Sequence, residues 1–187
     1  NVTVTEVDPI KALKAKFTGY NVMPIDEAVK NADVIFTATG CKNIVDERHF
    51  KDFKDGLILG NLGHFDVEIN VAKLREFAKS VKPIRQDVEE FTLPNGNRVY
   101  LLAQGRLANL VISEGHPSEV MDMSFALQAL ISEYIVKSKQ NLKPGIIMAP
   151  EDIVDQIGYL KLQSMGIKID KLTEEQFRYI HGYENGT

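Results

Sequence analysis

Residues 56–68 read Gly-Leu-Ile-Leu-Gly-Asn-Leu-Gly-His-Phe-Asp-Val-Glu, and they are the most informative part of the sequence. The apolar run 57–59 predicts a buried strand, and the glycine-bearing residues after it predict a loop. In an open α/β sheet, ligands bind beside the carboxyl ends of such strands. Glycine lets a backbone approach a ligand closely, and the neighbouring His64 can carry a proton near neutral pH. We therefore expect a binding site at this strand end.

Strands and helices alternate on both sides of this stretch. The patterns predict strands at 2–6, 20–23, 34–37 and 57–61, and helices at 9–18, 26–30, 46–53 and 71–78. Pro9 suits a first helical turn, Asp8 suits the N-cap before it, and Asp26 suits the cap of the second helix. Such alternation is typical of a doubly wound parallel sheet, so the predicted class is α/β with a partial Rossmann-type fold.

The pattern changes after Lys79. Asn95-Gly96 lies between two strand-like runs, 87–93 and 98–102, which predicts a hairpin. A long helix is predicted from Pro117 to about Lys137, with Ser118 as a candidate cap. Its predicted buried face consists of Val120, Met123, Leu127, Leu130, Ile131 and Tyr134. Helices are also predicted at 150–165 and 173–180, where Thr173-Glu174-Glu175-Gln176 has the spacing of a capping box.

Composition excludes several classes of protein. The 187 residues carry a formal net charge of −4, whereas a nucleic-acid surface is usually basic. No apolar run is long enough to span a membrane. Cys41 is the single cysteine, which fits a reducing cytoplasm, and it shows no metal-ligand spacing with the four histidines. Asn1 falls inside a predicted strand, so we expect the chain to be a fragment.

Two strand ends carry further candidate ligand contacts. An acidic residue such as Glu6 can bind the ribose hydroxyls of a dinucleotide, and its charge disfavours the 2′-phosphate of NADP; the alternative is a solvated strand end. The small residues Thr39, Gly40 and Cys41 can let the backbone reach a nucleotide, or can simply form a tight turn. Cys41 can equally be a small buried hydrophobic residue.

The histidines leave alternatives open. His64 can be exposed, buried with its polar atoms satisfied, or catalytic. His116 precedes Pro117 and is either a neighbour of a helix cap or a ligand contact at an interdomain hinge. Met121 and Phe125 lie one helical turn apart and can be core or ligand contacts. His49 and His181 lie on amphipathic segments and are predicted to be exposed.

The chain resembles the S-adenosylhomocysteine hydrolase (adenosylhomocysteinase) family over essentially its whole length, as a C-terminal fragment. The resemblance rests on Val4-Thr5-Glu6-Val7-Asp8-Pro9, Thr39-Gly40-Cys41, the run 61–68, Gly105-Arg106-Leu107-Ala108-Asn109-Leu110, Gly115-His116-Pro117-Ser118 and Leu172-Thr173-Glu174-Glu175-Gln176. It implies that residues 1–114 form an NAD-binding domain without its first strand and Gly-rich turn. It implies that residues 115–187 complete the substrate domain with helices and contribute oligomer contacts.

The resemblance also implies an activity. S-adenosylhomocysteine would be hydrolysed reversibly to adenosine and homocysteine with bound NAD, in one-carbon metabolism, by a cytoplasmic homotetramer. The partner expected for this fragment is the missing N-terminal part of the same protein. Neither nucleic acid, membrane nor metal is expected. An ordinary NAD-dependent dehydrogenase would need its own catalytic residues, and no independent set is evident.

The family's functional residues carry over one by one. Glu6 would bind the adenosine ribose of NAD, and Thr39, Gly40 and Cys41 would line the cofactor loop. Leu62, Gly63 and His64 would border the nicotinamide and the substrate ribose, with His64 as the catalytic group. Asn109 would hold the nicotinamide carboxamide. His116, Met121 and Phe125 would surround the substrate adenine.

Some features depart from the family pattern. Glu114 stands where the family has methionine, so S-inosylhomocysteine remains an alternative substrate, and a non-catalytic NAD-binding regulator is a second alternative. The ending at residues 183–187 lacks the basic, tyrosine-containing tail of many relatives and resembles archaeal and some bacterial members.

Overall fold

The computed structural model describes residues 1–182 and divides the chain into two compact units. The first unit is Asn1–Gly115, and the second begins at His116. The shortened ending at residues 183–187 lies outside the described residues. Across residues 1–182, every helix is too short or too polar to cross a membrane.

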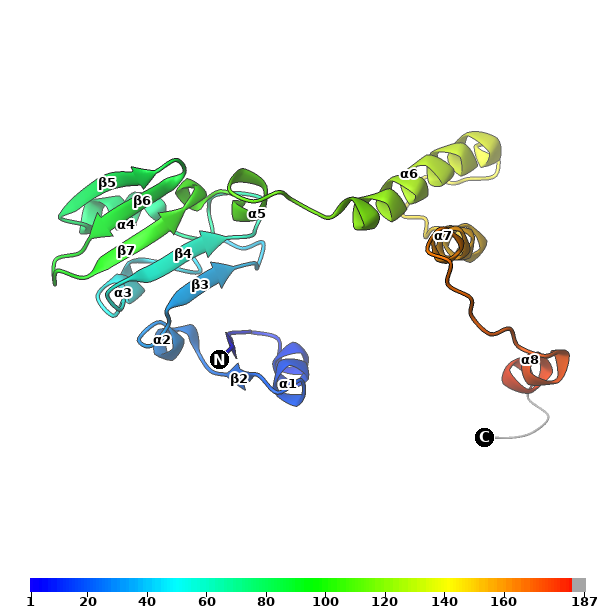
Figure 1. The fold of residues 1–187 in the computed structure, drawn as a ribbon, viewed down its shortest axis with the longest axis horizontal. Coiled ribbons are helices and arrows are strands. Elements are labelled where there is room, and N and C mark those ends of the chain that lie inside the picture. Colours follow the sequence, from blue (N-terminus) through cyan, green and yellow to red (C-terminus); the bar gives the residue numbers. More distant parts are fainter. Residues whose placement is uncertain (183–187) are drawn as a thin grey trace. The chain divides into compact units, whose positions relative to one another are not determined.

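A five-stranded mixed sheet forms the centre of the first unit (Figure 1). In spatial order its strands are β3 (Val34–Thr37), β4 (Leu57–Asn61), β7 (Arg98–Leu102), β6 (Val88–Thr92) and β5 (Ser80–Arg85). β3, β4 and β7 are parallel, whereas β6 and β5 are antiparallel to their neighbours. The predicted α/β, Rossmann-type class is confirmed. Because Thr37 pairs with Asn61, the carboxyl ends of β3 and β4 lie side by side.

The hairpin predicted around Asn95-Gly96 is present as β6 and β7, but β5 was not predicted from the sequence. β5 is largely exposed and contains Pro83, a residue normally excluded from central strands because it has no N–H to donate. In the part of the chain that the structure describes, β5 lies at the edge of the sheet, pairs only with β6, and shifts register between Pro83 and Arg85. An edge position tolerates proline, so the strand forms despite its local sequence.

A separate two-stranded parallel sheet contains β1 (Thr3–Val4) and β2 (Asn21–Val22). Both strands are shorter than the predicted 2–6 and 20–23. Among residues 1–182, β1 pairs only with β2 and β3 pairs only with β4. One edge of β1 and one edge of β3 are therefore without a strand partner.

The helix α1 (Pro9–Phe17) joins β1 to β2. As predicted, Asp8 caps it by accepting hydrogen bonds from the amides of Ile10 at 2.8 Å and Lys11 at 3.1 Å. Its apolar side chains are uncovered, since Ile10 is 71% and Phe17 is 85% exposed. Burial of its own apolar face therefore does not stabilise α1 in this chain.

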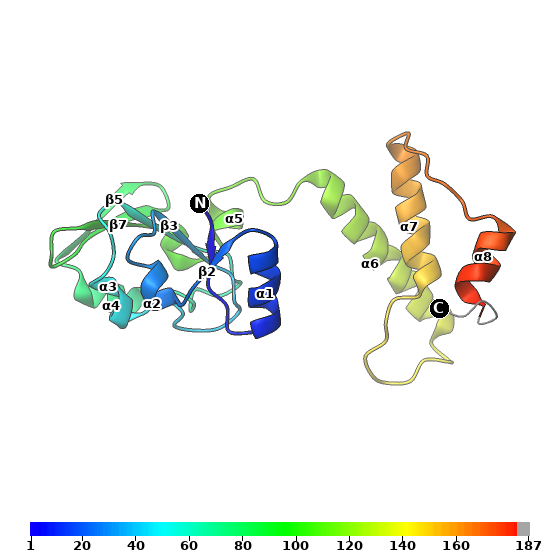
Figure 2. The ribbon, with the colours of Figure 1, turned by 90° about the horizontal axis from the view of Figure 1, so that it is seen from below.

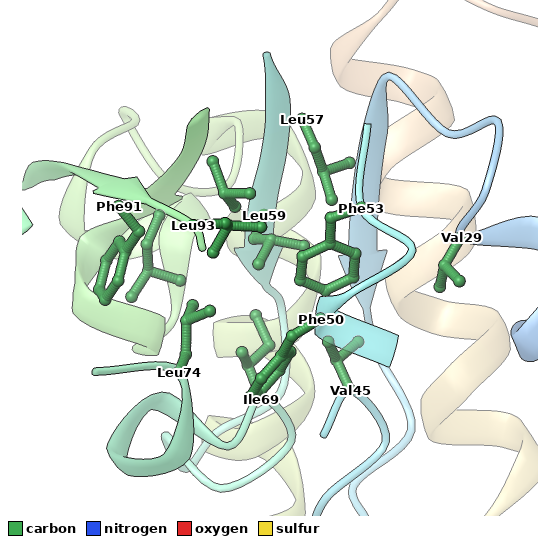
Figure 3. Close-up of a cluster of buried hydrophobic side chains, with 12 residues drawn as sticks. Val29, Val45, Phe50, Phe53, Leu57, Leu59, Ile69, Leu74, Phe91 and Leu93 are labelled. Atoms are coloured by element: carbon green, nitrogen blue, oxygen red, sulfur yellow. The ribbon is translucent and has the colours of Figure 1, made fainter. Parts of the chain in front are cut away.

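The hydrophobic core lies between the large sheet and the helices α3 (Glu47–Phe50) and α4 (Val71–Phe77), which Figure 2 shows on the same side of the sheet. α3 is shorter than the predicted 46–53. The ring of Phe50 lies 5.6 Å from that of Phe53 and 5.7 Å from that of Phe77, centroid to centroid. Twelve buried residues form the cluster (Figure 3): Val29, Val45, Phe50, Phe53, Leu57, Leu59, Ile69, Leu74, Phe91, Leu93, Val99 and Leu101.

The predictions for Asp26 and His49 are wrong. Asp26 lies inside α2 (Ile25–Ala28), which begins after Pro24 and has no side-chain cap. His49 is buried because the core edge supplies it with two polar neighbours. Its Nδ1 accepts a hydrogen bond from the amide of Asp46 at 3.1 Å. Its Nε2 faces the Asp26 carboxylate at 3.0 Å, a close approach rather than an aligned hydrogen bond.

The second unit contains three helices, α6 (Ser118–Ser138), α7 (Glu151–Ser164) and α8 (Glu174–His181). α6 and α7 pack against each other, and Lys161 of α7 binds Asp122 of α6 at 3.0 Å. The predicted capping box of α8 is present: Thr173 and Gln176 each accept a hydrogen bond from the other's backbone N–H.

α6 departs from the prediction at its start and on its face. Pro117 is the N-cap residue, and the hydroxyl of Ser118 donates instead to Glu119 at 3.4 Å. None of the predicted core residues of α6 is buried, and Val120 and Met123 are 51% and 41% exposed. Within the described residues of this unit α7 is the main element packed on α6, so much of the apolar face has nothing to cover it.

Candidate functional site

Glu6 follows Thr5 after the end of β1, close to the strand end where an acidic residue was predicted. Its Oε1 accepts hydrogen bonds from the amides of Val7 at 2.7 Å and Asp8 at 3.1 Å. These amides, Asp8 first and then Val7, hold the pKa of Glu6 below its usual range. Oε2 has no hydrogen-bond partner within residues 1–182. Glu6 thus presents an exposed, ionised acceptor.

The loop after β3 is held by the buried carboxylate of Glu68. Oε1 of Glu68 accepts hydrogen bonds from the amides of Gly40 at 2.8 Å and Thr39 at 3.1 Å. Oε2 accepts from the Thr39 amide at 2.9 Å and from the Thr39 hydroxyl at 2.8 Å. The amide of Cys41 donates in turn to the Thr39 hydroxyl oxygen at 3.1 Å. The three predicted cofactor-loop residues thus lie in one hydrogen-bonded turn, with Cys41 exposed rather than buried.

Two opposing effects set the pKa of Glu68. Burial alone would raise the pKa, because it disfavours the charged form. The donors from Thr39 and Gly40 outweigh burial, and the pKa of Glu68 lies below its usual range. The loop after β3 therefore already holds a negative charge supplied by the protein itself.

Asn61, at the end of β4, joins three segments of the chain. Its Oδ1 accepts hydrogen bonds from the amide of Gly63 at 2.7 Å and from the hydroxyl of Thr37 at 3.2 Å. Its Nδ2 donates to the carbonyls of Phe65 and Gly105, both at 2.8 Å, and approaches that of Gly63 at 3.2 Å. Asn61 is completely buried. It therefore connects the ends of β3 and β4 with the segment after β7.

Gly63 is required by close packing. A Cβ at this position would lie 1.9 Å from Oε1 of Glu68 and 3.0 Å from Oδ1 of Asn61. The residue that follows, His64, is exposed, and its ring meets the edge of Phe65 with centroids 4.7 Å apart. Leu62 is 41% exposed beside it. The loop after β4 thus presents Leu62 and His64 on its surface while Gly63 faces the interior.

Left-handed backbone follows β7 in the 3-10 turn η1 (Ala103–Gly105). The φ angles are 52° at Ala103, 57° at Gln104 and 81° at Gly105, although two of these residues carry a Cβ. Such angles are uncommon outside glycine and persist where surrounding structure enforces them. Here the bond from Asn61 to the Gly105 carbonyl supplies one such restraint.

Asn109 lies in the short helix α5 (Ala108–Val111) after this turn. Its Oδ1 is buried and has no hydrogen-bond partner within residues 1–182. An unpaired buried acceptor typically costs about 1–3 kcal/mol. A ligand group that donates a hydrogen bond at this point would remove that cost.

The structure brings some of the predicted site residues together and leaves others apart. Bonds through Glu68 and Asn61 link the loops that contain Thr39, Gly40, Cys41, Gly63 and His64 with the turn that precedes Asn109. Glu6 lies after a strand of the separate small sheet. His116, Met121 and Phe125 belong to the second unit, with Met121 partly buried and Phe125 exposed on α6.

Sequence reasoning missed Asn61 and Glu68 as residues that shape the site. Both lie in the quoted stretch 56–68, but their partners are distant in sequence: Glu68 binds Gly40, 28 residues away, and Asn61 binds Gly105, 44 residues away. The available signal was a single charged residue in an otherwise apolar segment, Val67-Glu68-Ile69, which indicates a buried and paired carboxylate.

Comparison with known proteins gives concordant matches. The family model described as S-adenosyl-L-homocysteine hydrolase, NAD binding domain, matches residues 1–115. Adenosylhomocysteinase of Saccharolobus solfataricus is 53% identical over 186 residues, covering 100% of this chain and 45% of that protein. Adenosylhomocysteinase of Pyrobaculum aerophilum is 52% identical over 186 residues, covering 100% of this chain and 42% of that protein.

A relative whose name gives a different substrate is almost as similar. S-inosyl-L-homocysteine hydrolase of Methanothermobacter thermautotrophicus is 46% identical over 189 residues, covering 100% of this chain and 45% of that protein. The chain therefore spans less than half the length of these relatives.

Proposed function

The chain belongs to the S-adenosyl-L-homocysteine hydrolase family, and from that membership we propose that it is part of an NAD-dependent enzyme that reversibly hydrolyses S-adenosyl-L-homocysteine to adenosine and L-homocysteine. In this proposal the first unit supplies the NAD site and the second unit supplies part of the substrate site. The observation that carries it is the network of Glu68 and Asn61, which gathers the predicted cofactor loops at neighbouring strand ends. Ligands of open α/β sheets bind at such strand ends.

The residues present suit NAD. Glu6 is an ionised acceptor with one carboxylate oxygen available, which fits two ribose hydroxyls and disfavours a 2′-phosphate. Asn109 has a buried Oδ1 that no donor among the described residues reaches, which fits the amide hydrogens of the nicotinamide carboxamide. Leu62 and Gly63 would border the nicotinamide, beside the turn formed by Thr39, Gly40 and Cys41. Bound NAD would supply hydride transfer at the 3′ carbon of the substrate ribose.

In this proposal His64 handles the proton of the ribose 3′-oxygen. It is exposed on the loop after β4, and its ring is braced by the edge of Phe65. Imidazole can accept or donate a proton near neutral pH, which suits a hydroxyl that is first oxidised and later restored. His64 would therefore be the catalytic residue that this chain contributes.

The substrate base is the second point of the proposal. His116, Met121 and Phe125 would surround it, with Phe125 offering an exposed aromatic face for stacking. S-inosyl-L-homocysteine is the alternative substrate, because two relatives at 46% and 47% identity are named S-inosyl-L-homocysteine hydrolase. Competition between the two nucleoside thioethers for the same protein separates these substrates.

The unpaired edges of β1 and β3 support an N-terminal part of the same protein as partner. A parallel strand between them would bond to both and would place the two sheets in one continuous order. The uncovered apolar side chains of α1 and α6 offer surface for the rest of that protein and for further copies in a homotetramer. We place this enzyme in the cytoplasm, in the activated methyl cycle of one-carbon metabolism.

The test is the nucleotide bound to the purified full-length protein. Denaturation followed by chromatography is expected to release NAD in stoichiometric amount. Asn109→Ala is expected to weaken NAD binding about tenfold through loss of the carboxamide bond. Asn97→Ala is the matched control, because its side chain donates to the Phe53 carbonyl at 2.8 Å on the hairpin and should leave NAD binding unchanged. A wild-type protein that neither contains nor binds NAD would contradict the proposal.

A further inference from the structure

Glu68 is a buried carboxylate for which the proposed chemistry has no direct use. It is 1% exposed, and its oxygens accept hydrogen bonds from the amides of Thr39 and Gly40 and from the hydroxyl of Thr39. Its own carbonyl accepts hydrogen bonds from the amides of Ile44 at 2.7 Å and Val45 at 3.1 Å. Glu68 therefore fastens the loop after β3 to the loop after β4 through both its side chain and its backbone.

One consequence concerns the amides of the loop after β3. Clustered backbone N–H groups commonly bind the phosphate of a nucleotide. Here the amides of Thr39 and Gly40 are occupied by Glu68, and the amide of Cys41 is occupied by the Thr39 hydroxyl. The carboxylate both uses the donors and repels a second anion. The turn is thus held by bonds within the protein, and a ligand can contact it only through groups other than these three amides.

A second consequence concerns the loop that contains His64. Gly63 lies so close to Glu68 that a Cβ at Gly63 would be 1.9 Å from Oε1 and 2.8 Å from Cδ. The backbone of Gly63 is not in the left-handed region, so the absence of a side chain serves this contact rather than a turn. Because Gly63 packs closely on Glu68, this contact also restrains the backbone position of the next residue, His64.

We propose that Glu68 is a positioning residue that sets the Thr39–Gly40 turn and the Gly63–His64 segment relative to each other before NAD binds. The inference rests on the proposed function, in which these two segments border the same cofactor. Glu68 acts through them and touches neither cofactor nor substrate. Its removal is therefore expected to change loop order and NAD affinity together.

The first experiment measures amide hydrogen exchange in the full-length protein without NAD. In Glu68→Ala, the amides of Thr39 and Gly40 should exchange about tenfold to a hundredfold faster, because each loses a bond to a charged acceptor. In Glu68→Gln the gain should be larger at Thr39 than at Gly40. An amide oxygen kept at the Oε1 position still accepts from Gly40 at 2.8 Å, whereas Thr39 loses its shorter bond, to Oε2 at 2.9 Å, and keeps only the bond to Oε1 at 3.1 Å. The matched control is Glu90→Gln. Glu90 is also a buried carboxylate, but it pairs with Lys82 at 2.9 Å and makes no hydrogen bond to either loop among the described residues.

The second experiment measures the dissociation constant of NAD. Glu68→Ala should weaken NAD binding by about tenfold to a hundredfold, as expected for misplaced binding groups, while Glu90→Gln leaves it unchanged. Gly63→Ala should have a similar effect to Glu68→Ala, because the new methyl group displaces the carboxylate. In the double variant the clash is gone. Adding Gly63→Ala to Glu68→Ala should therefore raise the dissociation constant of NAD by less than about twofold.

These arms separate the two proposals. If wild type binds no NAD, the proposed function fails, and exchange at Thr39 and Gly40 still decides whether Glu68 holds the turn. If wild type binds NAD but Glu68→Ala matches Glu90→Gln in exchange and affinity, the positioning role is overturned. The positioning role is also overturned if Gly63→Ala and Glu68→Ala weaken NAD binding by factors that multiply in the double variant. If Glu68→Ala does not fold, Glu68→Gln decides the result through the difference between Thr39 and Gly40.

Discussion

Replacing Asn61 by alanine should be among the most costly single changes at the strand ends. The side chain is completely buried and makes two bonds through Oδ1 and two short bonds through Nδ2. Each buried hydrogen bond contributes about 0.5–1.5 kcal/mol, and partners left without a bond add further cost. The expected loss is therefore about 3–5 kcal/mol of the free energy of unfolding.

The control for this prediction is Asn97→Ala. Its side chain makes one bond, to the Phe53 carbonyl at 2.8 Å, and is only partly buried, so about 1 kcal/mol should be lost. Urea unfolding of the full-length protein, followed by far-UV circular dichroism at one protein concentration, measures both changes. The Gly63 amide, which donates to Asn61 at 2.7 Å, should also exchange faster in Asn61→Ala alone. Equal costs for the two variants, with Gly63 exchange unchanged, would refute the reasoning.

Two further predictions concern catalysis and pH. His64→Asn should lower turnover by about 10²–10⁴-fold while NAD stays bound, as expected for a lost acid–base group; loss of NAD from a folded variant would contradict the role assigned to His64. Arg98 donates two hydrogen bonds to the Asp55 carboxylate and lowers the pKa of Asp55 from 3.8 to about 2. This pair stabilises the fold fully above the ordinary pKa of 3.8 and stops doing so as pH falls through about 2. The difference in urea midpoint between wild type and Asp55→Asn should therefore shrink between pH 4 and pH 2; a difference that stays constant down to pH 2 would count against the ion pair.

Features of the fold that depend on neighbouring residues in the sequence were predicted correctly. The Asp8 and Thr173 caps depend on residues within three positions, and the Asn95-Gly96 hairpin depends on adjacent strands. Where tertiary context decides, prediction failed. β5 forms because it lies at a sheet edge that tolerates Pro83. His49 is buried where the amide of Asp46 donates to its Nδ1 and the carboxylate of Asp26 lies beside its Nε2.

The candidate site divides in the same way. Residues at strand ends, such as Glu6 and His64, could be proposed as candidates because a strand followed by a loop is a local pattern. Glu68 and Asn61 could not be assigned their roles, because their partners lie 28 and 44 residues away and only the folded sheet brings them together. The exposure of Val120 on α6 was also unpredictable, since the helical pattern predicts an apolar face but does not say what covers it.

The most direct test of the central claim is the NAD dependence of thioether hydrolysis by the full-length protein. S-adenosyl-L-homocysteine and S-inosyl-L-homocysteine are supplied in turn, and the nucleoside and L-homocysteine are quantified by chromatography. We predict release of both products from at least one substrate, loss of release when NAD is stripped, and recovery when NAD is returned. Hydrolysis that is indifferent to NAD removal, or no cleavage of either thioether by protein that contains NAD, would contradict an NAD-dependent thioether hydrolase.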